Sequence, residues 1–131
     1  MKNDIEWIFF DVGSTLVNEE KVYCHRLQDI ARAAGEPFEK IYRSIIASAE
    51  EGVEKPDKRI FNIALSKASC NPENAVMIGD RIDNDIVPAK ELGMNTIWIK
   101  QGFGKYWNIT GEDEIPNDEI SSLSELQERF L

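Results

Sequence analysis

The chain has 131 residues, of which 42% are hydrophobic and 30% are charged, as expected for a single globular domain. Its 15 basic and 24 acidic residues give a net charge of −9, which disfavours binding to nucleic acid or to an anionic membrane through a broad electrostatic field. A phosphorylated substrate would be repelled as well, so a site for one must contain local positive charge or a metal ion.

We expect a cytoplasmic protein with reduced cysteines. The N-terminal residues lack the pattern of a signal peptide, and no apolar run in the sequence is long enough to span a bilayer. Cys24 and Cys70 are too few for a disulfide framework or a zinc site. His25 lies on the polar side of a predicted helix, and we interpret it as a surface residue.

The first third of the chain predicts a strand followed by a helix. Residues 5–10 form an apolar run rich in β-branched and aromatic side chains, which favours a strand. Apolar side chains recur at helical spacing over residues 19–34. Residues 38–51 are ambiguous, because they fit a helical stripe while residues 44–48 also fit a short strand.

The next segments predict a second helix, two short strands and a helix between them. Pro56 suits the first position of a helix. One face of that helix would carry Ile60, Phe61, Ala64, Leu65 and Ala68. Apolar runs predict strands over residues 75–78 and 95–99. Between these strands, Asp85 would cap a helix that Gly93 ends.

The last segment predicts a loop and a short final helix. Residues 102–104 open the loop, and Ser122 with Glu125 forms a capping-box pattern. Aromatic side chains of this loop would form either a lip over a site or a surface or dimer contact: Phe103, Tyr106 and Trp107. We interpret Trp7 and Trp98 as strand residues that pack against helices. The alternation of strands and helices predicts a mostly parallel sheet flanked by helices.

Asp11 ends the first apolar run and precedes a turn. Ligands of open α/β sheets bind outside the carboxyl ends of the strands, so a carboxylate here is a candidate nucleophile. Gly13 would let the backbone approach a ligand closely. Ser14 and Thr15 offer donors to an anion, although they could equally satisfy their own turn, and Asp11 could be a solvated strand end.

A lysine and an acidic loop accompany this aspartate. Lys55 precedes a predicted helix, whose positive end disfavours a cation unless an anion binds there. Asp80, Asp83 and Asp85 crowd the end of the 75–78 strand, and a cation would relieve their repulsion. Such hard oxygen ligands suit Mg²⁺. The alternatives are a solvated surface lysine and a capping Asp85 with solvated neighbours.

Together these segments resemble the haloacid dehalogenase-like (HAD) hydrolases. Residues 11–16 (DVGSTL), 55–57 (KPD) and 79–85 (GDRIDND) look like the first, third and fourth motifs of that family, and the resemblance covers most of residues 5–104. It implies a Rossmann-like, three-layer α/β core with a mostly parallel sheet. It also implies Mg²⁺-dependent phosphotransfer on a small phosphorylated substrate. An aspartyl-phosphate receiver domain would carry its acidic and acceptor groups in the opposite order.

The resemblance also assigns roles to the metal ligands. Asp11, Asp80 and the backbone carbonyl of Gly13 would hold Mg²⁺. Asp85 would support the metal shell, and Asp83 is a further candidate for that support.

The catalytic roles follow from the same resemblance. Asp11 would attack the phosphoryl group and form an aspartyl-phosphate that water hydrolyses. Lys55 would offset the clustered negative charge and bind the transferring oxygens. Ser14 and Thr15 would contact the substrate.

The sequence departs from the family in two places. Gly13 stands where phosphatases of the family usually carry a second aspartate as general acid and base, and its loss costs a factor on the order of 10²–10⁴ in rate. Only residues 17–54 separate the first and third motifs, where the family normally has a cap, a strand and a phosphate-binding Ser or Thr. We infer an internal deletion with its junction in residues 40–48, after which Ser44 or Ser48 would have to replace the second motif.

We therefore expect one HAD-like core domain over residues 1–131, with the cap largely absent and residues 19–47 as its remnant or a linker. Two interpretations remain. One is a HAD-type hydrolase whose activity is weak, and the other is a core without catalysis that acts as a truncated remnant, scaffold or binding domain. Apolar area left uncovered by a missing strand would favour a homodimer.

Overall fold

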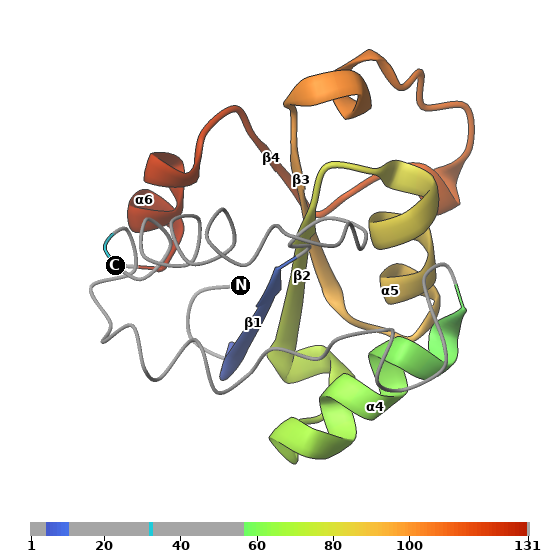
Figure 1. The fold of residues 1–131 in the computed structure, drawn as a ribbon, viewed down its shortest axis with the longest axis vertical. Coiled ribbons are helices and arrows are strands. Elements are labelled where there is room, and N and C mark those ends of the chain that lie inside the picture. The colour runs from blue at the N-terminus through green and yellow to red at the C-terminus, as the bar shows by residue number, and fades with distance from the viewer. Residues whose placement is uncertain (1–4, 11–31, 33–56, 131) are drawn as a thin grey trace, which may run out of the picture.

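A computed structural model of the chain describes residues 5–10, 32 and 57–130 (Figure 1). The strands are β1 (Trp7–Phe10), β2 (Ala75–Gly79), β3 (Asn95–Ile99) and β4 (Asp118–Ile120). The α-helices are α4 (Lys58–Ala68), α5 (Val87–Glu91) and α6 (Leu126–Phe130). Short 3-10 turns occupy Pro72–Asn74, Gly102–Tyr106, Glu112–Glu114 and Leu123–Glu125, and a π-helical turn occupies Ile82–Ile86.

The described strands form one parallel sheet in the order β1-β2-β3-β4. The register pairs Phe10 of β1 with Ile78 of β2, and Ile78 with Ile97 of β3. All carboxyl ends therefore lie on one edge, which we call the carboxyl rim. The predicted mostly parallel sheet is confirmed, as are the strands within residues 5–10, 75–78 and 95–99.

Side chains that alternate along the strands divide the core between two faces. On one face, Met77 and Ala75 pack against Phe61 and Leu65 of α4 and against Ala89 of α5. On the other face, Val76 and its neighbours pack against Leu126 of α6; the buried members are Val76, Ile78, Ile97, Ile99, Ile120 and Leu126. Figure 1 shows α4 and α5 on one side of the sheet and α6 on the other. The expected three-layer α/β architecture is confirmed.

Helix α4 begins later than the sequence predicted. Asp57 has a non-helical backbone and its carboxylate accepts a hydrogen bond from Arg59 N at 2.9 Å, so Asp57 is the N-cap and Lys58 is the first helical residue. The helix therefore begins two residues after the predicted first position. The predicted apolar face is confirmed by the burial of Ile60, Phe61 and Leu65.

The helical segment after β2 also differs from the prediction. It begins at Ile82, so Asp85 lies inside it and does not cap it. The physical reason is the apolar pair Ile82 and Ile86, which is fully buried against Trp98 and brings the first turn onto the sheet. The predicted end is correct, because Gly93 follows Leu92, the C-cap of α5, with a left-handed φ of +85°.

The chain after β3 contains more structure than the sequence indicated. Residues 102–106 form a 3-10 turn where a loop was predicted, and β4 was not predicted. Hydrogen bonds of Asn117 place β4, because its side-chain oxygen accepts from Thr96 N at 2.8 Å and its own N–H donates to Thr96 O at 3.0 Å.

An ion pair connects helix α6 to strand β4. Arg129 Nε donates to Asp118 Oδ2 at 2.7 Å and holds the pKa of that carboxyl below its usual value. One of the two hydrogen bonds of the predicted capping box is present, because the Glu125 carboxylate accepts from Ser122 N at 2.9 Å.

Several expectations lie outside the described residues. These concern the helix over residues 19–34, the ambiguous segment 38–51, the cap remnant 19–47, the deletion junction, Cys24 and His25. Within the described part, Cys70 is a buried free thiol whose pKa is raised mainly by desolvation. No helix in that part is both long and apolar enough to cross a membrane.

Candidate active site at the carboxyl rim

The described part of the candidate site is the loop between β2 and α5. It contains three predicted site residues, namely Asp80, Asp83 and Asp85. The other candidates lie outside the described residues: Asp11, Gly13, Ser14, Thr15 and Lys55. The described residues stop next to two of these candidates in the sequence. Strand β1 ends at Phe10, one residue before Asp11, and the N-cap of α4 is Asp57, two residues after Lys55.

Asp85 is fully buried and holds the start of this loop in place. Its carboxylate accepts a hydrogen bond from Arg81 N at 3.1 Å, which satisfies a backbone donor at the beginning of the helical turn. The same side chain lies over Gly79, where an added Cβ would come 2.5 Å from Asp85 Cβ and Cγ. Position 79 must therefore be glycine for the buried carboxylate to fit, which explains the Gly-Asp sequence at the end of β2.

Asp83 points to a different partner. Its carboxylate receives Arg81 Nη2 at 2.7 Å and Nε at 3.2 Å. The pKa of Arg81 is raised, first by this side-chain hydrogen bond and also by the charges of Asp83, Asp85 and Asp80. Arg81 thus supplies part of the charge compensation that the crowded carboxylates need. Asp83 contributes an ion pair at the surface here.

Asp80 follows Gly79 directly at the carboxyl rim, and its side chain is half-buried. The Trp98 indole Nε1 donates to the Asp80 carbonyl oxygen at 3.1 Å. Gly104 also lies against this residue, because a Cβ at position 104 would be 2.8 Å from the Asp80 carbonyl carbon. The sequence correctly indicated that Trp98 packs against a helical segment, but nothing in it signalled these two contacts with Asp80.

The oxygen ligands present are compatible with Mg²⁺. Among the described residues, no three His, Cys, Asp or Glu side chains converge on one point. Mg²⁺ needs only one or two protein carboxylates, because water and substrate phosphate complete its octahedral shell. Asp80 supplies one hard oxygen group at the rim, and Asp85 is buried within the same loop. The donor set therefore fits Mg²⁺ if one further carboxylate reaches the rim.

Comparisons with known sequences give the same family for most of this core. The HAD-hydrolase-like family matches residues 53–126, which is more than half of the chain. A glyceraldehyde 3-phosphate phosphatase from Pyrococcus furiosus is 38% identical over 92 residues, covering 70% of this chain and 38% of the relative. A phosphoserine phosphatase from Thermus thermophilus is 36% identical over 87 residues, covering 66% of this chain and 32% of the relative. The chain spans less than two fifths of the length of either relative.

Solved structures give the same fold. A 2-haloacid dehalogenase from Pseudomonas syringae superposes with a TM-score of 0.53 at 34% identity, covering 63% of this chain and 34% of that one. YfnB from Bacillus subtilis, whose crystal structure is bound to magnesium, superposes with a TM-score of 0.62 at 23% identity, covering 94% of this chain and 47% of that one. The parallel sheet with α4 and α5 on one face is the Rossmann-like core that these proteins share. The chain therefore belongs to the HAD-hydrolase-like family.

Proposed function

We propose that this chain is the core of a Mg²⁺-dependent phosphatase that hydrolyses a small phosphate monoester. The observation that carries the proposal is the pairing of β1 with β2. Phe10 lies opposite Ile78, and parallel neighbours are about 4.8 Å apart, so we infer that Asp11, the next residue in the sequence, follows its strand at the same rim as Asp80. Asp11 and Asp80 are then the first carboxylates beyond the ends of two adjacent strands, where one cation can bridge them.

The proposed substrate class rests on the charge of the rim and on the relatives. The two relatives are named as phosphatases of glyceraldehyde 3-phosphate and of phosphoserine, which are both small phosphate monoesters. A metal ion and Lys55 would offset the acidic rim, which otherwise repels a phosphate. Ser14 and Thr15 are the proposed hydrogen-bond donors to the phosphoryl oxygens.

The proposed chemistry is in-line transfer to Asp11. The Asp11 carboxylate attacks phosphorus, the bond to the leaving oxygen breaks, and the resulting aspartyl-phosphate is hydrolysed by water to release phosphate and regenerate the carboxylate. Mg²⁺, when bound by Asp11, Asp80 and the Gly13 carbonyl, supplies charge neutralisation at the phosphoryl group. Asp85 keeps the Asp80 loop in position through Arg81 N.

Because residue 13 is glycine, this reaction is limited to substrates whose leaving group departs without being protonated. A family phosphatase with an aspartate at this position can protonate the leaving oxygen, whereas glycine cannot. We therefore expect turnover of acetyl phosphate and p-nitrophenyl phosphate with Mg²⁺. Turnover of glycerol 3-phosphate should be slower by about 10²-fold or more, beyond the difference set by binding. Steady-state kinetics of the purified protein, with EDTA as the metal-free control, measure these rates.

Two outcomes would contradict parts of this proposal. Equal rates for the aryl and the alkyl phosphate would mean that another residue protonates the leaving group. No turnover of any of the three above blank would favour the interpretation as a core without catalysis. A Gly13→Asp variant provides the matched test, because it should raise the rate for glycerol 3-phosphate more than the rate for p-nitrophenyl phosphate.

A further inference from the structure

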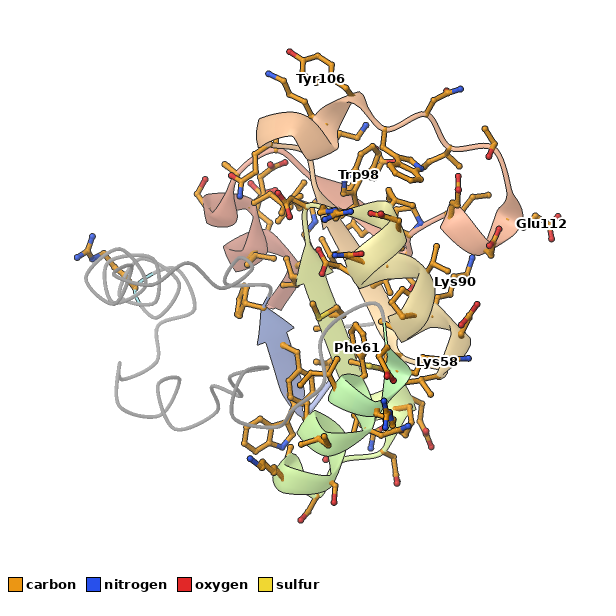
Figure 2. The ribbon with its side chains drawn as sticks, turned by 45° about the vertical axis from the view of Figure 1, so that its right-hand side comes forward. Lys58, Phe61, Lys90, Trp98, Tyr106 and Glu112 are labelled. Atoms are coloured by element: carbon orange, nitrogen blue, oxygen red, sulfur yellow. The ribbon has the colours of Figure 1, made fainter. Side chains whose placement is uncertain are left out.

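Trp98 makes a contact that the proposed chemistry does not yet use. Its ring is 3% exposed and packs with Ile82 and Ile86, the apolar pair of the turn that follows Asp80. From this position the indole N–H donates to the Asp80 carbonyl oxygen at 3.1 Å. Figure 2 shows Trp98 near the upper end of β3, beside the loop that follows β2. A buried side chain of one strand thus determines where the backbone lies at the end of its neighbour.

Gly104 restrains the same carbonyl group from another segment of the chain. It belongs to the 3-10 turn after β3, and a Cβ added to it would overlap the Asp80 carbonyl oxygen and come 2.8 Å from the carbonyl carbon. Among the described glycines, only Gly93 and Gly102 have a positive φ. The backbone conformation at position 104 therefore does not require glycine. Its lack of a side chain serves the close approach to Asp80.

The ring of Trp98 also has a charged side chain over it. Lys100 Nζ lies 5.0 Å from the centroid of the ring, within the range of a cation–π interaction. The same ammonium group pairs with Glu119 of β4 at 2.6 Å. The indole therefore has a defined orientation, with its N–H directed at Asp80. A donor fixed in this way can fix its acceptor in turn.

We propose that Trp98 and Gly104 are positioning residues that orient Asp80 for binding a divalent cation. The inference rests on the proposed function, because it takes Asp80 to be a metal ligand. A hydrogen bond and close backbone packing hold the Asp80 carbonyl group, so little backbone entropy is lost at Asp80 when a cation binds. Partners of this kind beyond the ligands commonly affect metal affinity by about one to two orders of magnitude.

The first test removes the hydrogen-bond donor. Trp98→Phe keeps an aromatic ring in the core and deletes the N–H donor to Asp80. We expect the dissociation constant for Mg²⁺, measured by isothermal titration calorimetry, to rise roughly fivefold, since a net hydrogen bond contributes about that factor. Trp107→Phe is the matched control, because its indole N–H donates to Glu114 at 3.3 Å in an exposed segment. It should leave the dissociation constant unchanged.

The second test uses the close packing. Gly104→Ala forces the turn or Asp80 to move, and we expect a tenfold or greater rise in the dissociation constant for Mg²⁺. Gly102→Asn is its control, because Gly102 lies in the same turn, has a φ of +58° that asparagine tolerates, and has nothing within 4 Å of an added Cβ. A purely structural role for Gly104 would lower the melting temperature without changing the metal affinity of the folded protein.

The outcomes separate this inference from the proposed function. If the wild-type protein binds no Mg²⁺, both are overturned. If it binds Mg²⁺ and the folded Trp98→Phe and Gly104→Ala variants bind equally well, only the inference is overturned. Should these variants fail to fold, a Trp7→Phe, Trp107→Phe protein reports through Trp98 alone. Its fluorescence should change on Mg²⁺ titration with the calorimetric dissociation constant, and an unchanged spectrum would overturn the inference.

Discussion

Asp11→Asn is expected to abolish phosphate release from acetyl phosphate and p-nitrophenyl phosphate. The substitution keeps the size and shape of the side chain but replaces the attacking carboxylate with an amide that is not nucleophilic. Removing the group that forms the covalent intermediate costs a factor on the order of 10⁴ or more in kcat, which places the residual rate at the blank. Phosphate release by the purified variant under saturating Mg²⁺ measures this loss.

Asp113→Asn makes the same change of charge at an exposed site and is the matched control. It should retain wild-type turnover, which shows that the loss in Asp11→Asn does not reflect the changed net charge of the acidic protein. Acid quenching of the wild-type protein during turnover should also trap phosphate on the chain, and Asp11→Asn should trap none. An Asp11→Asn variant that keeps a tenth or more of the activity would exclude Asp11 as the nucleophile.

Gly79→Ala is expected to destabilise the folded protein strongly. The new methyl group would lie 2.5 Å from Cβ and Cγ of Asp85, whose side chain is fully buried and bonded to Arg81 N. Neither the strand nor the carboxylate can move without losing packing or a buried hydrogen bond. We expect the free energy of unfolding in urea to fall by about 2–4 kcal/mol.

Gly111→Ala offers a matched comparison. Its added Cβ would also meet a carboxylate oxygen, at 2.6 Å from Asp113 Oδ1, but that side chain is exposed and can rotate away. The expected change is within about 0.5 kcal/mol. In an Asp85→Gly background the cost of Gly79→Ala should shrink, because no side-chain atom of residue 85 remains to clash with the new methyl group. Strict additivity of the two substitutions would show that Asp85 does not determine the need for glycine.

The central strands could be predicted because their signals are local. Residues 75–79 and 95–99 are short apolar runs bounded by polar and glycine residues, and strands buried on both faces need such runs. The burial of Ile60, Phe61 and Leu65 followed from spacing for the same reason. The family resemblance then supplied the sheet type, which periodicity indicates only in outline.

The elements that escaped prediction depend on contacts between distant residues. Strand β4 has three residues, of which Asp118 and Glu119 are acidic, and it forms because Asn117 bonds to Thr96. The helical turn at Ile82 begins where two isoleucines pack under Trp98, and this partner lies far along the chain. Asp85 is a good N-cap residue by type, but in the structure it lies inside the turn and accepts from Arg81 N, four residues before it, instead of from a later N–H.

The candidate site was predictable as a set of residue types and less so as a set of contacts. The sequence indicated that Asp80, Asp83 and Asp85 lie at a strand end, and the described loop confirms that placement. The three residues have different roles, which depend on where each side chain points. Asp83 pairs with Arg81, Asp85 is buried and bonded to Arg81 N, and Asp80 lies at the rim. Trp98 and Gly104 carry no local signal for their contacts with Asp80, because those contacts form only when β3 lies beside β2.

The central claim is that Asp11 and Asp80 meet around one cation at the carboxyl rim, and a crystal structure with Mg²⁺ and vanadate tests it most directly. Vanadate mimics the phosphoryl group during transfer. We predict Mg²⁺ bound by the Asp11 and Asp80 carboxylates, with vanadium in line with the other oxygen of Asp11 and with Lys55 in contact with the vanadate. Mg²⁺ bound by other residues, or vanadate away from Asp11, would contradict the account.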